Sequence, residues 1–395
     1  MSLNAGVLQW LSDTRKSAAA SPASPVYIPI NWGRTWLAKQ VAAREGIGKA
    51  VAAIHGDSVG RGYHSSNLDT KSWAGMLSTR LRGAADGGSG FKSIGDSSVA
   101  ILAKSQPQAM VTAYTAAGLL VTLTGTWADY VGPSGPGGSV LSTAVALSSA
   151  SFRVRGTSIA IYTIGTFTYE WQVDGGAWTQ VTVNGYQVWK TTLPAQSAGT
   201  HTVVVRYPSG GTGTLYLCGV SGENATGVVV NQFSRFGATS LTYDVADAIN
   251  SGDWNGGYRY PCDLLIYAIG VNDNGGGTAV DTSMLNAARV IRSARDRGGR
   301  NGDVDVLFVI NHCGSYNTSP NDKWHDFTAR YRALAISHGA AYVDLWTAGK
   351  NSWNYWNSLG YWGDSATPGA AGSDGVHLSD AGHLAAFSQI VKVLP

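Results

Sequence analysis

The sequence has few charged residues. Asp, Glu, Lys and Arg make up 13% of its 395 residues, about half of the roughly 25% that is usual in globular proteins. The net charge of +3 is not gathered into basic runs, which argues against a nucleic-acid partner. We therefore expect Gly, Ser, Thr, Asn and aromatic residues to cover the surface, a composition typical of secreted or particle-borne proteins.

Long apolar runs and a recognisable cysteine pattern are also missing. No stretch approaches the roughly 18 apolar residues that a membrane-spanning helix needs. Cys218, Cys262 and Cys313 show no metal-ligand spacing and allow at most one disulfide, so we expect buried thiols. No cleavable signal peptide is expected, because residues 1–10 have no basic flank and only a very short apolar core.

The clearest chemical pattern lies in residues 50–62, AVAAIHGDSVGRG. An apolar run there breaks into Gly56-Asp57-Ser58, as a buried strand ends in a tight turn. Gly-Asp-Ser occurs three times in the chain, but only this copy lies between an apolar run and a segment with helical spacing. Strand, turn and helix would open an α/β unit. Ser58 is therefore a candidate nucleophile, and the alternative is a turn serine without chemistry.

Two further patterns supply partners for such a serine. In SDGVHLSDAGH, residues 373–383, Asp374 and His377 are three positions apart in a turn. The carboxylate can then reach the imidazole and fix the tautomer whose other nitrogen accepts a proton. In IYAIGVNDN, residues 266–274, Asn272 follows an apolar run, and its side-chain amide is a suitable oxyanion donor.

In this order the patterns resemble the SGNH hydrolase superfamily, also called GDSL-type lipases and esterases. That family has a GDS turn, a glycine after the second strand, a G-x-N-D turn and a C-terminal D-x-x-H. The matching residues are Gly56 to Ser58, Gly237 in SRFGATS, Gly270 to Asp273, and Asp374 to His377. The resemblance covers roughly residues 50–100 and 225–395 and does not explain the middle of the chain.

The resemblance implies a serine esterase that works by acyl transfer. His377 would take the proton of Ser58, and Asp374 would orient His377. Ser58 would attack an ester carbonyl and form an acyl-enzyme that water then hydrolyses. The oxyanion would be held by the backbone N–H groups of Ser58 and Gly237 and by the amide of Asn272. This mechanism needs no metal and no cofactor, and none is expected.

The middle of the chain has a different character. Short alternating runs separated by glycine turns fill residues 106–222, among them TYEWQVDGGAW and LPAQSAGTHTVVVRY. Alternation with turn signals every 8 to 12 residues or so predicts an antiparallel sandwich. These runs resemble the jelly-roll domains attached to carbohydrate esterases of the same superfamily. The module would either form a wall of the substrate groove or serve as a structural lid or spacer.

The rest of the chain alternates strands with helices, which predicts a parallel sheet covered on both faces. The expected fold is α/β, a three-layer flavodoxin-like SGNH core interrupted by an inserted all-β jelly-roll sandwich. The expected parts are an N-terminal extension with a linker and short helix (1–48), the first part of the core (49–105), the sandwich (106–222) and the second part of the core (223–395). Strands are predicted at residues 50–54, 228–233, 263–269, 304–311 and 341–345, and helices at 34–45, 69–81, 238–250, 282–297, 321–338 and 379–393.

An aromatic stretch, WTAGKNSWNYWNSLGYW at residues 346–362, precedes the predicted catalytic turn. Aromatic side chains on a loop beside a nucleophile suit stacking against sugar faces, with amides for the hydroxyl groups. We predict that one or more of Trp353, Tyr355, Trp356 and Tyr361 line a substrate groove. The alternative is that the aromatic residues pack this stretch against the core, and at least two of them are expected to do so.

Other polar residues have simpler interpretations. His55 and His312 follow predicted strands and either rim the site or, as the favoured interpretation, bind backbone groups at the strand ends. Asp57 and Asp273 are expected to support their turns by accepting backbone hydrogen bonds. The other residues interpreted as structural are His64, His383, Glu223, Asp344 and Gly363; for Asp344, which ends a predicted strand, the alternative is a place near the site.

Taken together, these patterns predict an esterase that removes short acyl groups, most simply acetyl, from a polysaccharide. One alternative is a lipid or broad-specificity aryl or carboxyl esterase, and another is a carbohydrate-binding adhesin without catalysis. The partner is expected to be an acetylated polysaccharide or another ester, while the N-terminal extension is a candidate for oligomerisation or virion attachment. An extracellular or virion-associated location is expected, as for a phage tail component or a secreted bacterial enzyme.

Overall fold

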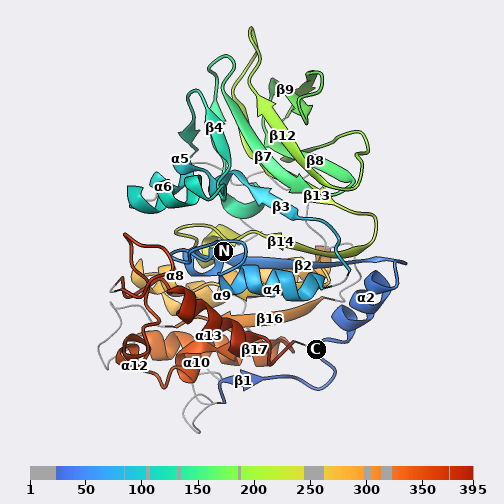
Figure 1. The fold of residues 1–395 in the computed structure, drawn as a ribbon. Coiled ribbons are helices and arrows are strands. Elements are labelled where there is room, and N and C mark those ends of the chain that lie inside the picture. The colour runs from blue at the N-terminus through green and yellow to red at the C-terminus, as the bar shows by residue number, and fades with distance from the viewer. Residues whose placement is uncertain are drawn as a thin grey trace, which may run out of the picture.

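A computed structural model describes residues 24–83, 85–103, 107–130, 135–185, 188–243, 262–297, 304–312, 323–372 and 374–394 of the chain. Within these ranges the chain forms one largely parallel sheet, two antiparallel sheets and helices, a mixed α/β architecture (Figure 1). No helix in the described ranges is both long enough and apolar enough to cross a membrane.

The parallel sheet contains the five strands that the sequence predicts. Its order is β1-β17-β16-β15-β2-β14, and all neighbours are parallel except the edge pair β1 and β17. Strand β2 therefore lies inside the sheet, between β14 and β15. The strands are β1 (Val26–Tyr27), β2 (Lys49–Gly56), β14 (Gly227–Gln232), β15 (Leu264–Ala268), β16 (Asp305–Ile310) and β17 (Ala341–Asp344).

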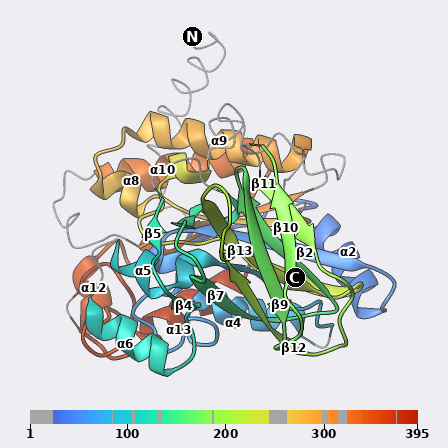
Figure 2. The same ribbon diagram turned by 90° about the horizontal axis from the view of Figure 1, so that it is seen from above.

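Helices cover both faces of this sheet, because successive residues of a buried strand point to opposite sides. Along β2, Ala52 and Ile54 pack in one buried cluster with residues of α2, α4 and α13. Val51 and Ala53 pack in another cluster with residues of α9 and α10. The two views show these helix groups on opposite sides of the sheet (Figures 1 and 2). The helices are α2 (Arg34–Arg44), α4 (Trp73–Arg82), α9 (Val280–Arg297), α10 (Lys323–Ser337) and α13 (Asp380–Ile390).

Several short helices occupy the connections. The helix predicted at residues 238–250 is described only as far as residue 243, where the chain forms a 3-10 turn, η3 (Ser240–Tyr243); residues 244–250 lie outside the described residues. The others are α3 (Ser58–Arg61), α5 (Ser98–Leu102), α6 (Gln108–Ala116), α8 (Val271–Gly275), α11 (Leu345–Ala348), α12 (Trp353–Ser358), η1 (Ile94–Asp96) and η2 (Pro136–Gly138).

The part of the sequence between α6 and β14 forms two antiparallel sheets. Their orders are β10-β9-β12-β7-β4 and β11-β8-β13-β6-β5, and β3 adds to the second by pairing with β13. Phe152 and Val203 of the first sheet share a buried cluster with Ile161 and Leu217 of the second, so the core lies between the sheets. The strands are β3 (Gly90–Ser93), β4 (Thr122–Thr124), β5 (Ala128–Asp129), β6 (Leu141–Thr143), β7 (Ser149–Arg155), β8 (Ser158–Ile164), β9 (Phe167–Val173), β10 (Thr179–Val183), β11 (Val188–Thr192), β12 (Thr200–Arg206) and β13 (Leu215–Glu223).

Residues 24–48 pack on the parallel sheet. Trp36 of α2 is 0% exposed and lies in the cluster that covers one face of the sheet. The indole N–H of Trp32 donates a hydrogen bond to the carbonyl of Val306 (2.8 Å), and β1 extends the sheet at β17. This part of the segment that the sequence assigns to an extension thus contributes to the packed α/β layers.

Candidate active site

The turn after β2 presents Ser58 at the carboxyl end of the strand. Gly56 has no room for a side chain, because an added Cβ would lie 2.5 Å from Oγ of Ser234. Asp57 then caps α3, and one oxygen of its carboxylate accepts from the N–H groups of Val59 (2.9 Å) and Gly60 (3.2 Å). This cap starts a single helical turn whose first residue is Ser58.

The Asp57 carboxyl group is part of the support of this turn. Its second oxygen accepts from the side-chain amide of Asn311 (3.4 Å). Burial raises the pKa of Asp57 to about 7, although the two backbone N–H groups oppose the shift. The hydroxyl of Tyr243 donates to the carbonyls of Gly56 (2.9 Å) and Phe233 (2.6 Å), which ties β2 to the end of β14. The expectation that Asp57 accepts backbone hydrogen bonds is confirmed.

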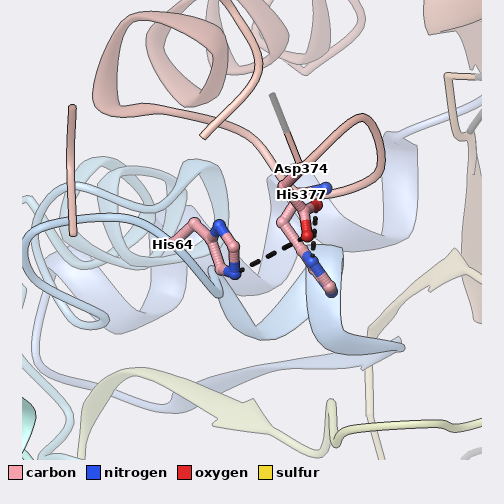
Figure 3. A group of neighbouring side chains, drawn as sticks. All are labelled: His64, Asp374 and His377. Atoms are coloured by element: carbon pink, nitrogen blue, oxygen red, sulfur yellow. Dashed lines mark hydrogen bonds and ion pairs between the residues drawn. The ribbon is translucent and has the colours of Figure 1, made fainter. Parts of the chain in front are cut away.

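The structure brings Ser58, His377 and Asp374 together, although they come from opposite ends of the chain. Nε2 of His377 lies 2.8 Å from Oγ of Ser58. Nδ1 of His377 lies 2.9 Å from Oδ1 of Asp374, as Figure 3 shows. These distances form a continuous hydrogen-bonded relay, in which a proton on Nδ1 leaves Nε2 free to accept the hydroxyl proton of Ser58.

The charge of Asp374 is stabilised by its histidine. Burial works to raise the pKa of Asp374, but the hydrogen bond and the charge of His377 together outweigh burial and hold this pKa well below its ordinary value. The same carboxylate oxygen accepts from the backbone N–H of Val376 (3.0 Å) and of His377 (2.5 Å). A carboxylate held in this way stays ionised near neutral pH and keeps the imidazole in one orientation.

The turn that bears His377 is held at three successive carbonyl groups. The indole N–H of Trp353 donates to the carbonyl of Gly375 (3.1 Å), and Nε2 of His312 lies 2.6 Å from the carbonyl of Val376. The N–H of Gly363 donates to the carbonyl of His377 (2.9 Å). The favoured interpretation of His312, a histidine bound to backbone, is therefore confirmed, and the backbone it binds is that of the candidate catalytic turn.

Asn272 binds the glycine block, which is the segment SRFGATS that carries Gly237. The side-chain amide of Asn272 donates one hydrogen bond to the carbonyl of Ala238 (2.9 Å). A primary amide has two N–H donors, so the second is available to a ligand. Gly237, next to Ala238, is exposed and adopts φ +65°, and open space surrounds the position of an added Cβ. Behind them, Asp273 accepts from the N–H (2.8 Å) and hydroxyl (2.6 Å) of Ser240.

One residue of the site is missed by the sequence interpretation. His64 is 1% exposed, and its ring stacks on that of His377 with centroids 4.7 Å apart and planes at 27°. Its Nε2 lies 4.0 Å from Oδ2 of Asp374 (Figure 3). Burial, followed by the charge of His377, lowers the pKa of His64 to about 4, so a neutral ring covers one face of the His377 imidazole at neutral pH.

The position of His64 depends on close packing that a sequence pattern does not reveal. Its φ of +64° is unusual for a residue with a side chain. A Cβ added to Gly363 would lie 2.6 Å from Cβ of His64, so the third Gly-Asp-Ser copy supplies the glycine that this contact needs. The feature that marks His64 is its left-handed backbone conformation, which the sequence does not reveal.

The same three side chains are also the candidate metal ligands of the described part of the chain. One ligand atom from each of His64, Asp374 and His377 lies within 4.8 Å of the others. A metal ion bound by all three would compete with the hydrogen bond between Nδ1 of His377 and Asp374, or would engage the nitrogen that faces Ser58. The arrangement therefore fits a hydrogen-bonded proton relay better than a resident cation.

The aromatic stretch contributes mainly to packing. Trp356 is 4% exposed and packs against His312 and Trp362, so it offers no free ring face to a ligand. Trp353 is half-buried and stacks on Trp362 with centroids 5.6 Å apart. The partly exposed Tyr355 is covered by the ammonium of Lys350, 4.1 Å from its ring centroid. The expectation that at least two of these aromatic side chains pack against the core is confirmed by Trp356 and Trp362.

Buried neutral histidines predict a loss of stability in mild acid. Burial lowers the pKa of four histidines to between about 3 and about 4; they are His55, His64, His312 and His383. Their imidazoles regain a pKa near 6.5 in the unfolded chain, which therefore binds more protons than the folded chain below pH 6.5. The free energy of unfolding should fall between pH 7 and pH 5. Asp57 has the opposite effect on the free energy of unfolding. Because its pKa is raised to about 7, the folded chain takes up a proton near pH 7 that the unfolded chain does not, which adds stability as the pH falls.

His383→Gln isolates one of these contributions. His383 is 0% exposed, and its lowered pKa should remove up to about 2 kcal/mol of stability between pH 7 and pH 5. The difference in unfolding free energy between the parent and His383→Gln, measured by urea denaturation, should therefore shrink by this amount at pH 5. An equal difference at both pH values would contradict the prediction.

Comparison with known families places these residues in context. Residues 167–385, more than half of the chain, match the GDSL-like Lipase/Acylhydrolase family. The chain belongs to this family. Membership in the GDSL-like family supports an esterase or acylhydrolase activity. The matched range contains Gly237, Asn272, Asp374 and His377 but begins after Ser58, which reaches the site through β2.

The fold of this GDSL-like chain is similar to that of solved structures. One described as a peptidoglycan O-acetylesterase in action is 18% identical, covers 95% of both chains and gives a TM-score of 0.57. A family two carbohydrate esterase from Cellvibrio japonicus is 13% identical, covers 69% of this chain and 93% of its own, and gives a TM-score of 0.28. At 18% identity the likeness to the first structure concerns the fold alone. A search of curated protein sequences gives no match.

Proposed function

We propose that this chain is a serine esterase that removes short acyl groups, acetyl above all, from a polysaccharide. The observation behind the proposal is the hydrogen-bonded sequence from Ser58 through His377 to Asp374, with distances of 2.8 and 2.9 Å. In the acylation step, Oγ of Ser58 bonds to the ester carbonyl carbon while its proton passes to Nε2 of His377. The same proton then goes to the leaving alkoxide of the sugar, and the acyl group stays on Ser58.

Deacylation repeats the step with water as the nucleophile. His377 takes a proton from water, the hydroxide attacks the acyl carbon, and Ser58 leaves with that proton restored. Acetic acid is released and the enzyme returns to its starting state. The carboxylate of Asp374 stays ionised throughout and stabilises the imidazolium that forms in each step.

Three groups are proposed as oxyanion donors. They are the backbone N–H groups of Ser58 and Gly237 and the second amide N–H of Asn272. The bond from Asn272 to the carbonyl of Ala238 supports this set, because it fixes the amide next to Gly237. Donors that are already in place when charge develops on the carbonyl oxygen lower the barrier without reorganisation.

We assign the parallel layer to the flavodoxin-like class. Taken in chain order, β2, β14, β15, β16 and β17 lie in the spatial order 2-1-3-4-5, which is the order of doubly wound folds of that class. The order reverses between β2 and β15, and ligands in such sheets bind beyond the carboxyl ends of the strands at this point. Ser58 follows β2 and Asn272 follows β15, which supports the assignment of the site.

A polysaccharide substrate is supported by the antiparallel part of the chain. We propose that its two facing sheets form a jelly-roll module inserted between the Gly-Asp-Ser turn and the glycine block, as in carbohydrate-binding modules. The likeness of fold to a peptidoglycan O-acetylesterase over 95% of the chain fits this proposal. The phage-tail origin and the extracellular or virion-associated location stay predictions.

The test compares p-nitrophenyl acetate, butyrate and octanoate as substrates of the full chain. The proposal predicts a kcat/KM that falls with chain length, together with release of acetate from an acetylated polysaccharide. A rate that rises toward octanoate would favour the lipid or broad-specificity esterase. Tight binding to polysaccharide without hydrolysis of any ester would favour the adhesin.

A further inference from the structure

A crevice separates the five-stranded antiparallel sheet from the helix that follows the serine turn. Its volume is about 610 Å³, within the range of roughly 300 to 1,000 Å³ that is usual for small-molecule sites. Strands β7 and β12 line one side, and α4 lines the other. Figure 1 shows these strands above α4. The crevice includes Arg61, which lies on the same helical turn as Ser58.

The side of the crevice formed by β7 and β12 presents hydrogen-bond donors and no carboxylate side chains. Arg153 and Arg155 alternate with buried residues along β7, so both point away from the core between the sheets. On β12 they face Thr202 and Thr200 in register. All four side chains are exposed. No Asp or Glu of β7 or β12 is among the residues that line the crevice.

The helix side adds a third guanidinium. Nε of Arg82 is buried and has no hydrogen-bond partner within the described residues, while its Nη2 donates to the carbonyl of Ser89 (3.1 Å). Burial lowers the pKa of Arg82, Asp86 opposes the shift, and the nearby charge of Arg155 adds to it. Asp86 in turn binds Arg155 at 2.7 Å. Of these two guanidinium groups, only that of Arg155 pairs with Asp86 within the described residues.

The charges on the floor of the crevice balance one another. Arg61 binds Asp96 (2.8 Å) and Asp69 (3.1 Å). The ammonium of Lys92 lies 3.6 Å from Asp96 and 3.7 Å from Asp69. Two cations thus meet two anions, and the surplus of positive charge comes from the arginines of β7 and α4.

We propose that this crevice binds a carboxylate-bearing stretch of the polysaccharide. Arg153, Arg155 and Arg82 would pair with the carboxylates, since a guanidinium offers two parallel N–H donors to one carboxylate. The threonine hydroxyls of β12 would bind sugar hydroxyl groups. This inference takes from the proposed function that the partner is a polysaccharide. It adds that this polysaccharide is acidic.

The test measures binding to a Ser58→Ala protein, which cannot consume an ester. Tetragalacturonate serves as the acidic probe, and the same tetrasaccharide with every carboxyl group methyl-esterified serves as the neutral probe. Titration calorimetry should show binding of the acid and at least about tenfold weaker binding of the methyl ester. Arg153→Gln and Arg155→Gln, each added to Ser58→Ala, should each weaken binding of the acid by about tenfold.

Arg44→Gln is the matched control, because Arg44 is an exposed arginine of α2 that does not line the crevice. Thermal unfolding of each variant checks that the fold is kept, which matters most for Arg155→Gln since it loses its pair with Asp86. Equal affinity for the two probes, no binding of the acid, or unchanged affinity in both crevice variants would overturn the inference. Hydrolysis of p-nitrophenyl esters by the parent involves no glycan. It therefore tests the proposed esterase function independently of the binding experiment.

Discussion

Ser58→Ala is expected to lower kcat for p-nitrophenyl acetate by about ten thousand- to a million-fold. The substitution removes the atom that bonds to the acyl carbon, and Nε2 of His377, 2.8 Å away in the parent, is left without a hydroxyl to activate. Any remaining rate would come from binding and oxyanion donors alone. Steady-state kinetics at neutral pH measure the effect, and a fluorophosphonate probe should label the parent but not the variant.

Ser388→Ala is the matched control for this loss. Ser388 is an exposed serine of α13 whose hydroxyl donates to the carbonyl of Leu384 (2.8 Å). Its replacement should leave the rate within a factor of about two, as is usual for surface changes away from a site. If Ser58→Ala kept a tenth or more of the parent's rate while remaining folded, another residue would have to be the nucleophile.

Asn272→Ala is expected to lower kcat by about 100- to 1,000-fold, the usual cost of losing one oxyanion donor. KM should change little, because the lost hydrogen bond strengthens only when charge develops on the carbonyl oxygen. Ser58 can still be acylated, so a slow release of p-nitrophenol should remain. Rapid-mixing kinetics on p-nitrophenyl acetate separate this slow acylation from a complete loss of the nucleophile.

Asn286→Ala distinguishes chemistry from loop support. The amide of Asn286 donates to the hydroxyl of Ser240 (3.0 Å) and so holds the segment after Gly237 from behind, while Asn272 holds it at Ala238 (2.9 Å). Asn286→Ala should therefore cost a small factor in kcat. A loss as large as that of Asn272→Ala would mean that the position of the loop, and not the second N–H of Asn272, decides the rate.

The parallel strands and the residues that meet at Ser58 follow from local patterns in the sequence. An apolar run ending in a glycine turn is visible within a dozen residues, and parallel strands bring their carboxyl ends to one edge whatever the distance along the chain. For the same reason, a turn after β2, a turn after β15 and a turn near the C-terminus can be assigned to one site before any coordinates are known.

What the sequence does not reveal depends on contacts between distant turns. His64 looks like one more loop histidine until its left-handed backbone and the bare Cα of Gly363 place it against His377. Trp353 resembles a sugar-stacking residue, yet its indole N–H binds the carbonyl of Gly375. Aromatic composition alone cannot separate a ring that supports a turn from a ring that meets a ligand, because both use the same surfaces.

The position of β2 inside the parallel sheet affects the order in which the parts of the protein can fold during synthesis on the ribosome. Its neighbours β14 and β15 are synthesised only after every strand of the antiparallel sheets. Those sheets are built from consecutive segments and are free to fold as they emerge, whereas β2 must wait with its apolar side chains uncovered. His377 leaves the ribosome later still, so Ser58 is made long before the histidine that it contacts.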